Sequence, residues 1–179
     1  GTNTTTNTTT NTTNTINTNT QSTSNFEDTY YIPKTIQKVD TGVYKAHAST
    51  LNGHPEPGDQ TGKEVLIAPT DESKLYKVYR YNGDIKINRA VAFIMGDLCN
   101  NENVGYNQSR TPELINQLRA VNYNPTQVGL CNTDCSEIIA CAIQTAFALA
   151  HIQQTVPLWS TSEMDNELPK IGFARVPTN

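Results

Sequence analysis

One short stretch of the chain, CNTDCSE at residues 131–137, places a cysteine where it could act as a nucleophile. Asp134 and Glu137 have the D-x-x-E spacing of a helix capping box, so we expect Asp134 to be the cap and Cys135 the first helical residue. The partial positive charge at a helix N-terminus favours the thiolate, the reactive form of cysteine. Free backbone N–H groups beside the thiol could hold the oxyanion of a tetrahedral intermediate. This pattern predicts Cys135 as an attacking thiol.

The cysteines also allow interpretations without catalysis. Cys135 could be a small buried residue, as free cysteines often are, and Cys141 is expected to be one because it lies mid-helix among Ala and Ile. Cys131, Cys135, Cys141 and His151 could be considered as zinc ligands, but structural zinc sites usually carry C-x-x-C pairs rather than ligands along one apolar helix. We therefore predict no metal and no cofactor. A Cys99–Cys131 disulfide is left open.

A catalytic thiol needs a histidine as general base, and the chain offers only His47, His54 and His151. A continuous helix would place His151 roughly 24 Å from Cys135, far beyond the reach of a hydrogen bond. His47 lies in a strand-like stretch. His54 lies in the turn-rich loop LNGHPEPGDQTG and remains the candidate base within the chain.

Three helical patterns should position these residues. Apolar residues recur at helical spacing over residues 88–99. Thr111, Pro112 and Glu113 form a helix start, with a capping hydroxyl, a proline at the first position and an acid near the positive end, and this helix should run to about residue 121. The third helix should run from residue 134 or 135 to about 151. It is almost entirely apolar or small, so protein should surround it.

Strand-like patterns occupy residues 43–49, 64–68 and 75–81, the last of which is aromatic and β-branched. Residues 161–179 are expected to form a short helix and then an extended piece. These patterns place both strands and helices in one domain.

The first twenty residues are Thr and Asn except for Gly1 and Ile16, and such a tract has almost nothing to bury. We predict residues 1–24 as a low-complexity arm or linker, residues 25–50 as a connecting segment, and residues 51–179 as the domain. Because Thr favours extended structure, an alternative is that the arm lies against neighbouring subunits of a larger assembly. Asn-x-Thr triplets in this tract arise from its composition and do not by themselves indicate a secreted glycoprotein.

Charge and hydropathy exclude two classes of partner. The formal net charge is −4 and there is no basic cluster, so we expect no nucleic-acid partner. No apolar run approaches the roughly 20 residues that span a bilayer, so we expect no membrane partner.

Three motifs in order carry a family resemblance: GDQTGKEV at 58–65, NENVGYNQSR at 101–110 and CNTDCSE at 131–137. Over about residues 51–150 the chain resembles phage-encoded cell-wall lysins of the NlpC-type group, which are related to CHAP amidases and share the papain-like fold. The resemblance implies a papain-like α+β fold, in which a helical part with the nucleophile helix lies beside a small antiparallel sheet. It also implies a cysteine hydrolase, an endopeptidase or amidase, that degrades peptidoglycan and is associated with a phage tail.

The resemblance also suggests roles for individual residues. Cys135 matches the nucleophile, and Tyr106 matches a tyrosine that packs near the thiol. Gln108 and Arg110 are expected to brace the loop of Tyr106. In the family the catalytic histidine follows the nucleophile, on a strand behind a Gly-Asp segment, and no such segment occurs before Asn179. The chain is therefore expected to be truncated before that histidine, or to be an inactive structural or binding module that keeps the fold.

The implied partners are bacterial peptidoglycan and, through residues 1–24, other virion or tail proteins in an oligomeric assembly. The implied location is the virion or the extracellular space, with action at the bacterial cell wall.

Overall fold

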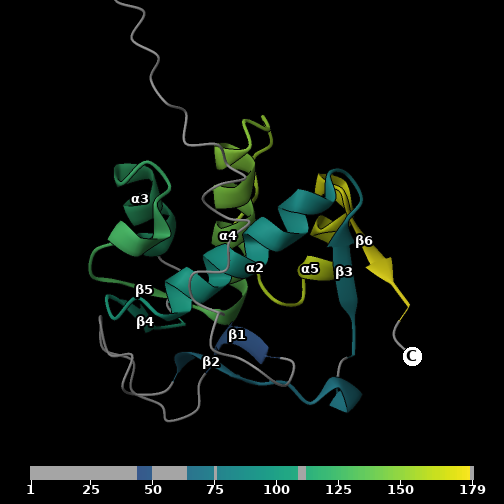
Figure 1. Ribbon diagram of the computed structural model, residues 1–179, viewed down its shortest axis with the longest axis horizontal. Coiled ribbons are helices and arrows are strands. Elements are labelled where there is room, and N and C mark those ends of the chain that lie inside the picture. Colours follow the sequence, from purple (N-terminus) through teal and green to yellow (C-terminus); the bar gives the residue numbers. More distant parts are fainter. Residues whose placement is uncertain (1–43, 50–63, 75, 109–111, 178–179) are drawn as a thin grey trace, which may run out of the picture.

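The computed structural model describes residues 44–49, 64–74, 76–108 and 112–177. Within this part, helices combine with three two-stranded sheets, so the predicted α+β class is confirmed (Figure 1). The predicted arm at residues 1–24 lies outside the described residues, as does most of the connecting segment.

Two apolar helices form the centre of the domain. α4 (Cys135–Leu149) and α2 (Ile85–Cys99) pack across each other, as Figure 1 shows. Most residues of α4 are buried, which confirms that protein surrounds it, and the helix ends two residues before the predicted His151. The core gathers around this crossing and stabilises it by removing apolar surface from water.

The starts of the other two helices differ slightly from expectation. α2 begins at Ile85, one turn earlier than predicted, because the side chain of Asp84 accepts a hydrogen bond from the Lys86 N–H at 2.9 Å and caps the helix there. α3 (Glu113–Ala120) has Pro112 as its N-cap, with no side-chain capping bond, rather than a cap at the predicted Thr111. The acidic Glu113 does occupy the first turn, as predicted.

The strands pair in three separate places. The pairs are β1 (Tyr44–Ala48) with β2 (Val65–Pro69), β3 (Val78–Tyr81) with β6 (Phe173–Val176), and β4 (Val104–Tyr106) with β5 (Cys131–Thr133). The first two pairs are antiparallel and the third is parallel. β4 and β5 were not predicted, because three-residue strands carry too little alternation to be recognised. α3 lies between them in the chain and forms their crossover connection.

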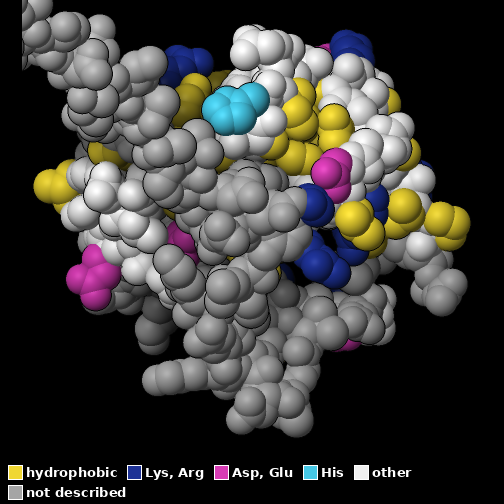
Figure 2. Space-filling view, turned by 45° about the horizontal axis from the view of Figure 1, so that its top comes forward, with side chains coloured by type: hydrophobic (Ala, Val, Ile, Leu, Met, Phe, Trp, Pro, Cys, Tyr) yellow, Lys and Arg dark blue, Asp and Glu magenta, His cyan; other side chains and the backbone are white. Residues whose placement is uncertain are grey.

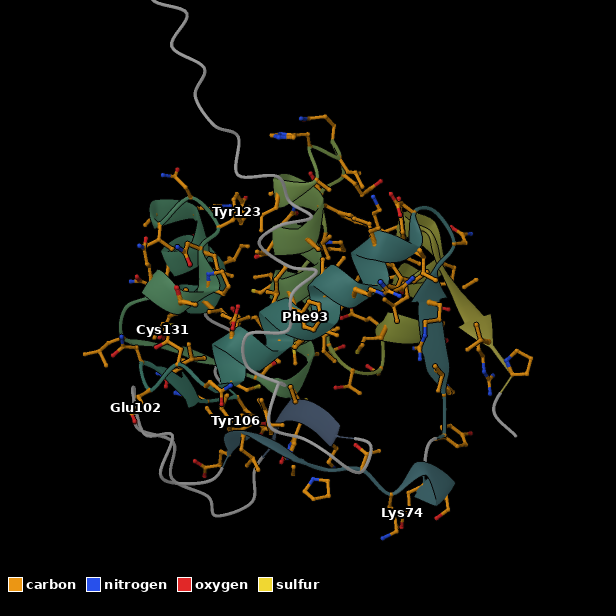
Figure 3. All side chains as sticks on the ribbon, in the orientation of Figure 1. Lys74, Phe93, Glu102, Tyr106, Tyr123 and Cys131 are labelled. Atoms are coloured by element: carbon orange, nitrogen blue, oxygen red, sulfur yellow. The ribbon has the colours of Figure 1, made fainter. Side chains whose placement is uncertain are left out.

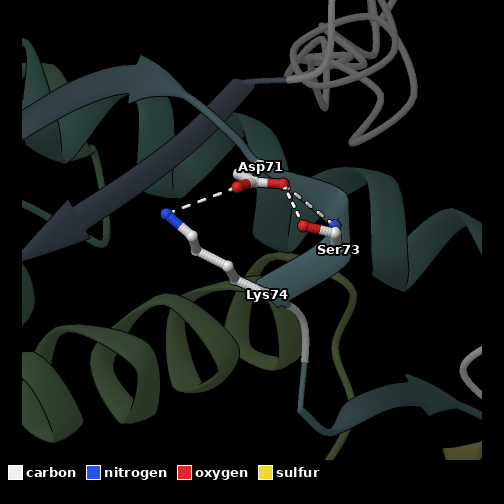
Figure 4. Close-up of polar contacts among 3 residues, drawn as sticks. All are labelled: Asp71, Ser73 and Lys74. Atoms are coloured by element: carbon white, nitrogen blue, oxygen red, sulfur yellow. Dashed lines mark hydrogen bonds and ion pairs between the residues drawn. The ribbon is translucent and has the colours of Figure 1, made fainter.

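A short turn, η1 (Glu72–Lys74), leads from β2 towards β3. The carboxylate of Asp71 accepts hydrogen bonds from the N–H and hydroxyl of Ser73 at 3.1 and 2.6 Å, and Lys74 Nζ lies 3.4 Å from its other oxygen (Figure 4). These hydrogen bonds lower the pKa of Asp71. The turn is a local, exposed structure and lies apart from the cysteine described below.

The C-terminal segment folds back onto the start of β3. It contains α5 (Met164–Glu167) and then η3 (Pro169–Ile171). Asp165 of α5 accepts hydrogen bonds from Lys77 and from the Tyr79 hydroxyl. None of the helices in the described ranges is long and apolar enough to cross a membrane.

Candidate active site

The first turn of α4 has the cap that the sequence predicts. Asp134 Oδ1 accepts hydrogen bonds from the N–H groups of Ser136 and Glu137 at 2.9 and 2.8 Å, and from the Ser136 hydroxyl at 2.9 Å. Glu137 in turn has a hydrogen bond with the backbone of Asp134. This reciprocal arrangement is a capping box, and it makes Cys135 the first residue of the helix.

Cys135 is the one cysteine of the four that is partly exposed. Its sulfur lies 3.4 Å from the hydroxyl oxygen of Thr161, and the thiol opens onto a pocket of about 370 Å³. The pocket is lined by hydroxyl, amide and carboxylate side chains around the thiol: Gln108, Asp134, Cys135, Ser136, Ser160, Thr161 and Ser162. Such a pocket can hold a polar group, for example a peptide unit, against the sulfur.

The loop that carries Thr161 is fixed at both ends. Trp159 Nε1 donates a hydrogen bond to the carbonyl oxygen of Ser136 at 3.2 Å, which ties the loop to the first turn of α4. The N–H and hydroxyl of Ser160 both donate to Glu163 Oε2 at 2.7 Å. Thr161 is therefore held against the thiol by bonds on each side of it.

Tyr106 is buried at the end of β4, next to this pocket. Figure 3 shows it on the side of the molecule that carries β1 and β2. Its hydroxyl interacts with the side chains of Gln108 and Cys135. Burial raises the pKa of Tyr106, and the nearby Cys135 and Asp134 act in the same direction, so the hydroxyl is a neutral donor near neutral pH. The structure thus brings Tyr106 to Cys135, as the resemblance implies.

Behind the cap, the carboxyl group of Glu137 is buried. Burial raises its pKa to about 8, and repulsion by the Asp134 carboxylate adds to the shift. One oxygen, Glu137 Oε1, has no hydrogen-bond partner among the described residues. A carboxyl group in this position favours its neutral form at pH 7, which avoids a second full negative charge beside Asp134.

The three remaining thiols are buried. Burial raises the pKa of Cys99 and of Cys131 to about 12, and raises that of Cys141 well above its usual value. These thiols have little thiolate character, so none is suited to nucleophilic attack. All four cysteines are free, so the open Cys99–Cys131 disulfide is not formed.

Neither of the two histidines that the structure describes is placed against Cys135. His151 is exposed, two residues beyond the far end of α4, and has a left-handed backbone with φ of 57°. His47 lies in β1, where Ala46 and Ala48 pack towards the core, so strand alternation turns His47 to the opposite face. There its Nδ1 lies 3.3 Å from the Ser49 hydroxyl, and burial together with Lys45 lowers its pKa.

Several predicted positions lie outside the described residues: His54, the surrounding loop with the GDQTG motif, and Arg110. In the described ranges, no group of three or more His, Cys, Asp or Glu side chains is arranged to hold a metal ion.

The sequence interpretation missed the hydroxyl side chains at residues 160–162. The signal is present as W-S-T-S, a run of small hydroxyl residues after an apolar stretch. A run of this kind suggests a loop, but nothing in it indicates that the loop returns to the start of α4.

A family model described as endolysin-like domain matches residues 44–178, which include every described residue of the pocket. The match does not distinguish the NlpC-type or CHAP-related subtype. Comparison with curated proteins and with solved structures found no match. The chain therefore belongs to the endolysin-like domain family, which implies a lytic action of phage origin on the peptidoglycan of the bacterial cell wall.

Proposed function

We propose that this domain is a cysteine hydrolase that cuts a peptide or amide bond of peptidoglycan, with Cys135 as its nucleophile. The observation that carries the proposal is the position of Cys135: it is the first residue of a buried helix, partly exposed, and it faces a polar pocket of about 370 Å³. Helix N-termini stabilise negative charge, both on a thiolate and on the oxyanion that follows its attack.

In the proposed reaction, the thiolate of Cys135 attacks the carbonyl carbon of the scissile bond and forms a tetrahedral oxyanion. Collapse of this intermediate breaks the C–N bond, leaves a thioester on Cys135, and releases the amine with the proton first taken from the thiol. Water then hydrolyses the thioester and regenerates the thiol. The neutral hydroxyl of Tyr106 and the hydroxyl of Thr161 stand beside the sulfur as hydrogen-bond donors to negative charge.

The candidate for the proton transfer is His54, which lies outside the described residues. Of the two described histidines, His47 lies in β1 and His151 lies beyond the far end of α4, and neither has a contact with the thiol. Association with a phage tail through residues 1–24 stays a prediction, because these residues lie outside the described part.

The test is digestion of purified cell-wall sacculi by the full chain, with new amino termini and soluble fragments measured by mass spectrometry. Cys135→Ser should abolish release, and His54→Gln should reduce it by several orders of magnitude. His47→Gln and His151→Gln are matched controls and should retain activity. Release of soluble wall fragments by the Cys135→Ser variant would show that Cys135 is not the nucleophile.

A second candidate function is a wall-binding module without chemistry. The observation in its favour is that both described histidines lie away from the thiol. Under this alternative, the full chain would sediment with sacculi and release no fragment at any pH between 5 and 9.

A further inference from the structure

A second, larger hollow lies away from the thiol pocket and shares no residue with it. It has a volume of about 760 Å³, within the range of ligand sites, and it lies between β3 and the first half of α2. Tyr81, Val91, Ala92 and Phe173 make much of its lining apolar. Ile85 is 69% exposed at its edge and adds apolar surface there.

The charged residues that line this groove are both arginines, Arg80 from β3 and Arg89 from α2. None of its described lining residues carries a carboxylate. The neighbouring Asp84 uses its carboxylate to cap α2. Among the described residues, neither arginine has an ion pair, and Arg80 donates only to the Tyr79 carbonyl at 3.1 Å. On the right-hand side of Figure 2, where Figure 1 places β3 and β6, several Lys and Arg side chains gather beside hydrophobic ones.

The groove also runs along an open strand edge. β3 pairs with β6 on one side, and on the other side the Asn88 side chain bonds both the N–H and the carbonyl of Tyr81, at 2.9 and 3.1 Å. Asn88 thus takes the place of a neighbouring strand at one residue. By the alternation of an antiparallel pair, the backbone groups of Tyr79 point to the same edge. The Tyr79 carbonyl already accepts from Arg80, so among the described residues the Tyr79 N–H is the backbone group left for a ligand there. The carbonyl oxygen of an extended peptide could accept a hydrogen bond from this N–H.

We infer that this groove binds the peptide stem of peptidoglycan, with carboxylates of the stem held by Arg80 and Arg89. Three observations agree on this ligand: the Tyr79 N–H on the strand edge suits a peptide carbonyl, two arginines without ion pairs among the described residues suit carboxylates, and the apolar lining suits alanine side chains. The inference rests on the proposed wall-lytic function and gives the domain a site that holds the stem away from the cysteine.

The experiment measures binding of a synthetic stem pentapeptide with free carboxylates to the full chain by isothermal titration calorimetry. Mass spectrometry after each titration confirms that the peptide is intact. Arg80→Gln and Arg89→Gln should each weaken binding about tenfold, the size of one charge-assisted hydrogen bond. Arg175→Gln is the matched control, since Arg175 is exposed on β6 and does not line the groove. Arg175→Gln should leave the affinity for the peptide unchanged. Circular dichroism should show that all three variants keep the fold of the unaltered chain.

The same peptide with its carboxylates converted to amides should bind at least tenfold more weakly to the unaltered chain. Absence of stem binding, an equal loss in Arg175→Gln, or undiminished binding of the amide peptide would each overturn the inference. Cys135→Ser separates it from the proposed reaction. That variant should bind the stem peptide with unchanged affinity although it cannot cut the wall. Binding in the groove is therefore tested separately from the proposed reaction.

Discussion

The sulfur of Cys135 and the hydroxyl of Thr161 lie 3.4 Å apart, although 26 positions separate them in the chain. The contact joins the first residue of α4 to a loop that begins beyond the other end of the same helix. Trp159 anchors that loop to Ser136, one residue from the thiol. The chain thus runs back along the whole length of α4 and completes the pocket around Cys135.

Cys135 should be the one thiol that reacts in the native protein. The other three cysteines are buried, and burial raises their pKa values, to about 12 for Cys99 and Cys131. Treatment of the native chain with iodoacetamide at pH 7.5 should give a single adduct, located at Cys135 by peptide mapping. Denaturant should expose the other three. A native adduct on Cys141 would contradict the described burial.

Replacement of Thr161 should slow alkylation of Cys135. In Thr161→Val the hydroxyl that can donate to the thiolate is lost while the shape of the side chain is kept, so the rate at pH 7 should fall severalfold. Thr161→Ser keeps the hydroxyl and should restore most of the rate. Equal rates in all three proteins would show that the 3.4 Å contact does not affect the thiol.

Loss of the α4 cap should destabilise the domain. Asp134→Ala removes three hydrogen bonds to one carboxylate oxygen and should lower the free energy of unfolding by about 1–2 kcal/mol. Asp134→Asn keeps an acceptor and should cost less. Asp84→Ala, at the more exposed cap of α2, removes the hydrogen bond from the Lys86 N–H; it is the comparison variant and should cost less than Asp134→Ala. Urea denaturation measures all three.

Glu137 should make stability depend on pH. Its pKa is about 8 in the folded domain and near 4.5 when the chain is unfolded. The folded state therefore binds the proton more tightly. The stabilisation of the folded state by this proton is fully present below pH 4.5 and is lost as the pH rises through 8. Its total effect on the free energy of unfolding is on the order of a few kcal/mol.

Glu137→Gln replaces the neutral acid with a neutral amide and should flatten the stability profile between pH 5 and 8. The control Glu102→Gln changes an exposed carboxylate and should leave the profile as it is. If the free energy of unfolding of Glu137→Gln changes with pH as steeply as that of the unaltered chain, Glu137 is charged in the folded state. The predicted dependence of stability on the Glu137 proton would then be wrong.

Local signals in the sequence were sufficient for much of the fold. The cap at Asp134, the first helical position of Cys135 and the burial of α4 all depend on residues within one or two turns, and all three were predicted and confirmed. Strands β1, β2 and β3 were also recognised from local signals: loose alternation at β1, a short apolar run at β2, and aromatic and β-branched residues at β3.

Features that depend on distant parts of the chain were not predictable in this way. The pairing of β4 with β5 needs two three-residue segments on either side of α3 to meet, and neither has a pattern of its own. The hydroxyl residues 160–162 line the pocket of Cys135 because Trp159 Nε1 donates a hydrogen bond to a backbone carbonyl of α4 and holds the loop there. The early start of α2 is different: Asp84 is a local cap, but exposed Ile85 obscured the apolar pattern there.

Trp159 is the only tryptophan of the chain, and its indole N–H bonds the residue next to Cys135. Indole fluorescence responds to the loss of a hydrogen bond and to new groups nearby, so the protein carries its own optical probe at the thiol pocket. Acylation, alkylation or ligand entry at Cys135 can be followed as a change in emission in real time. Binding in the groove between β3 and α2, which Trp159 does not line, should remain silent in the same signal.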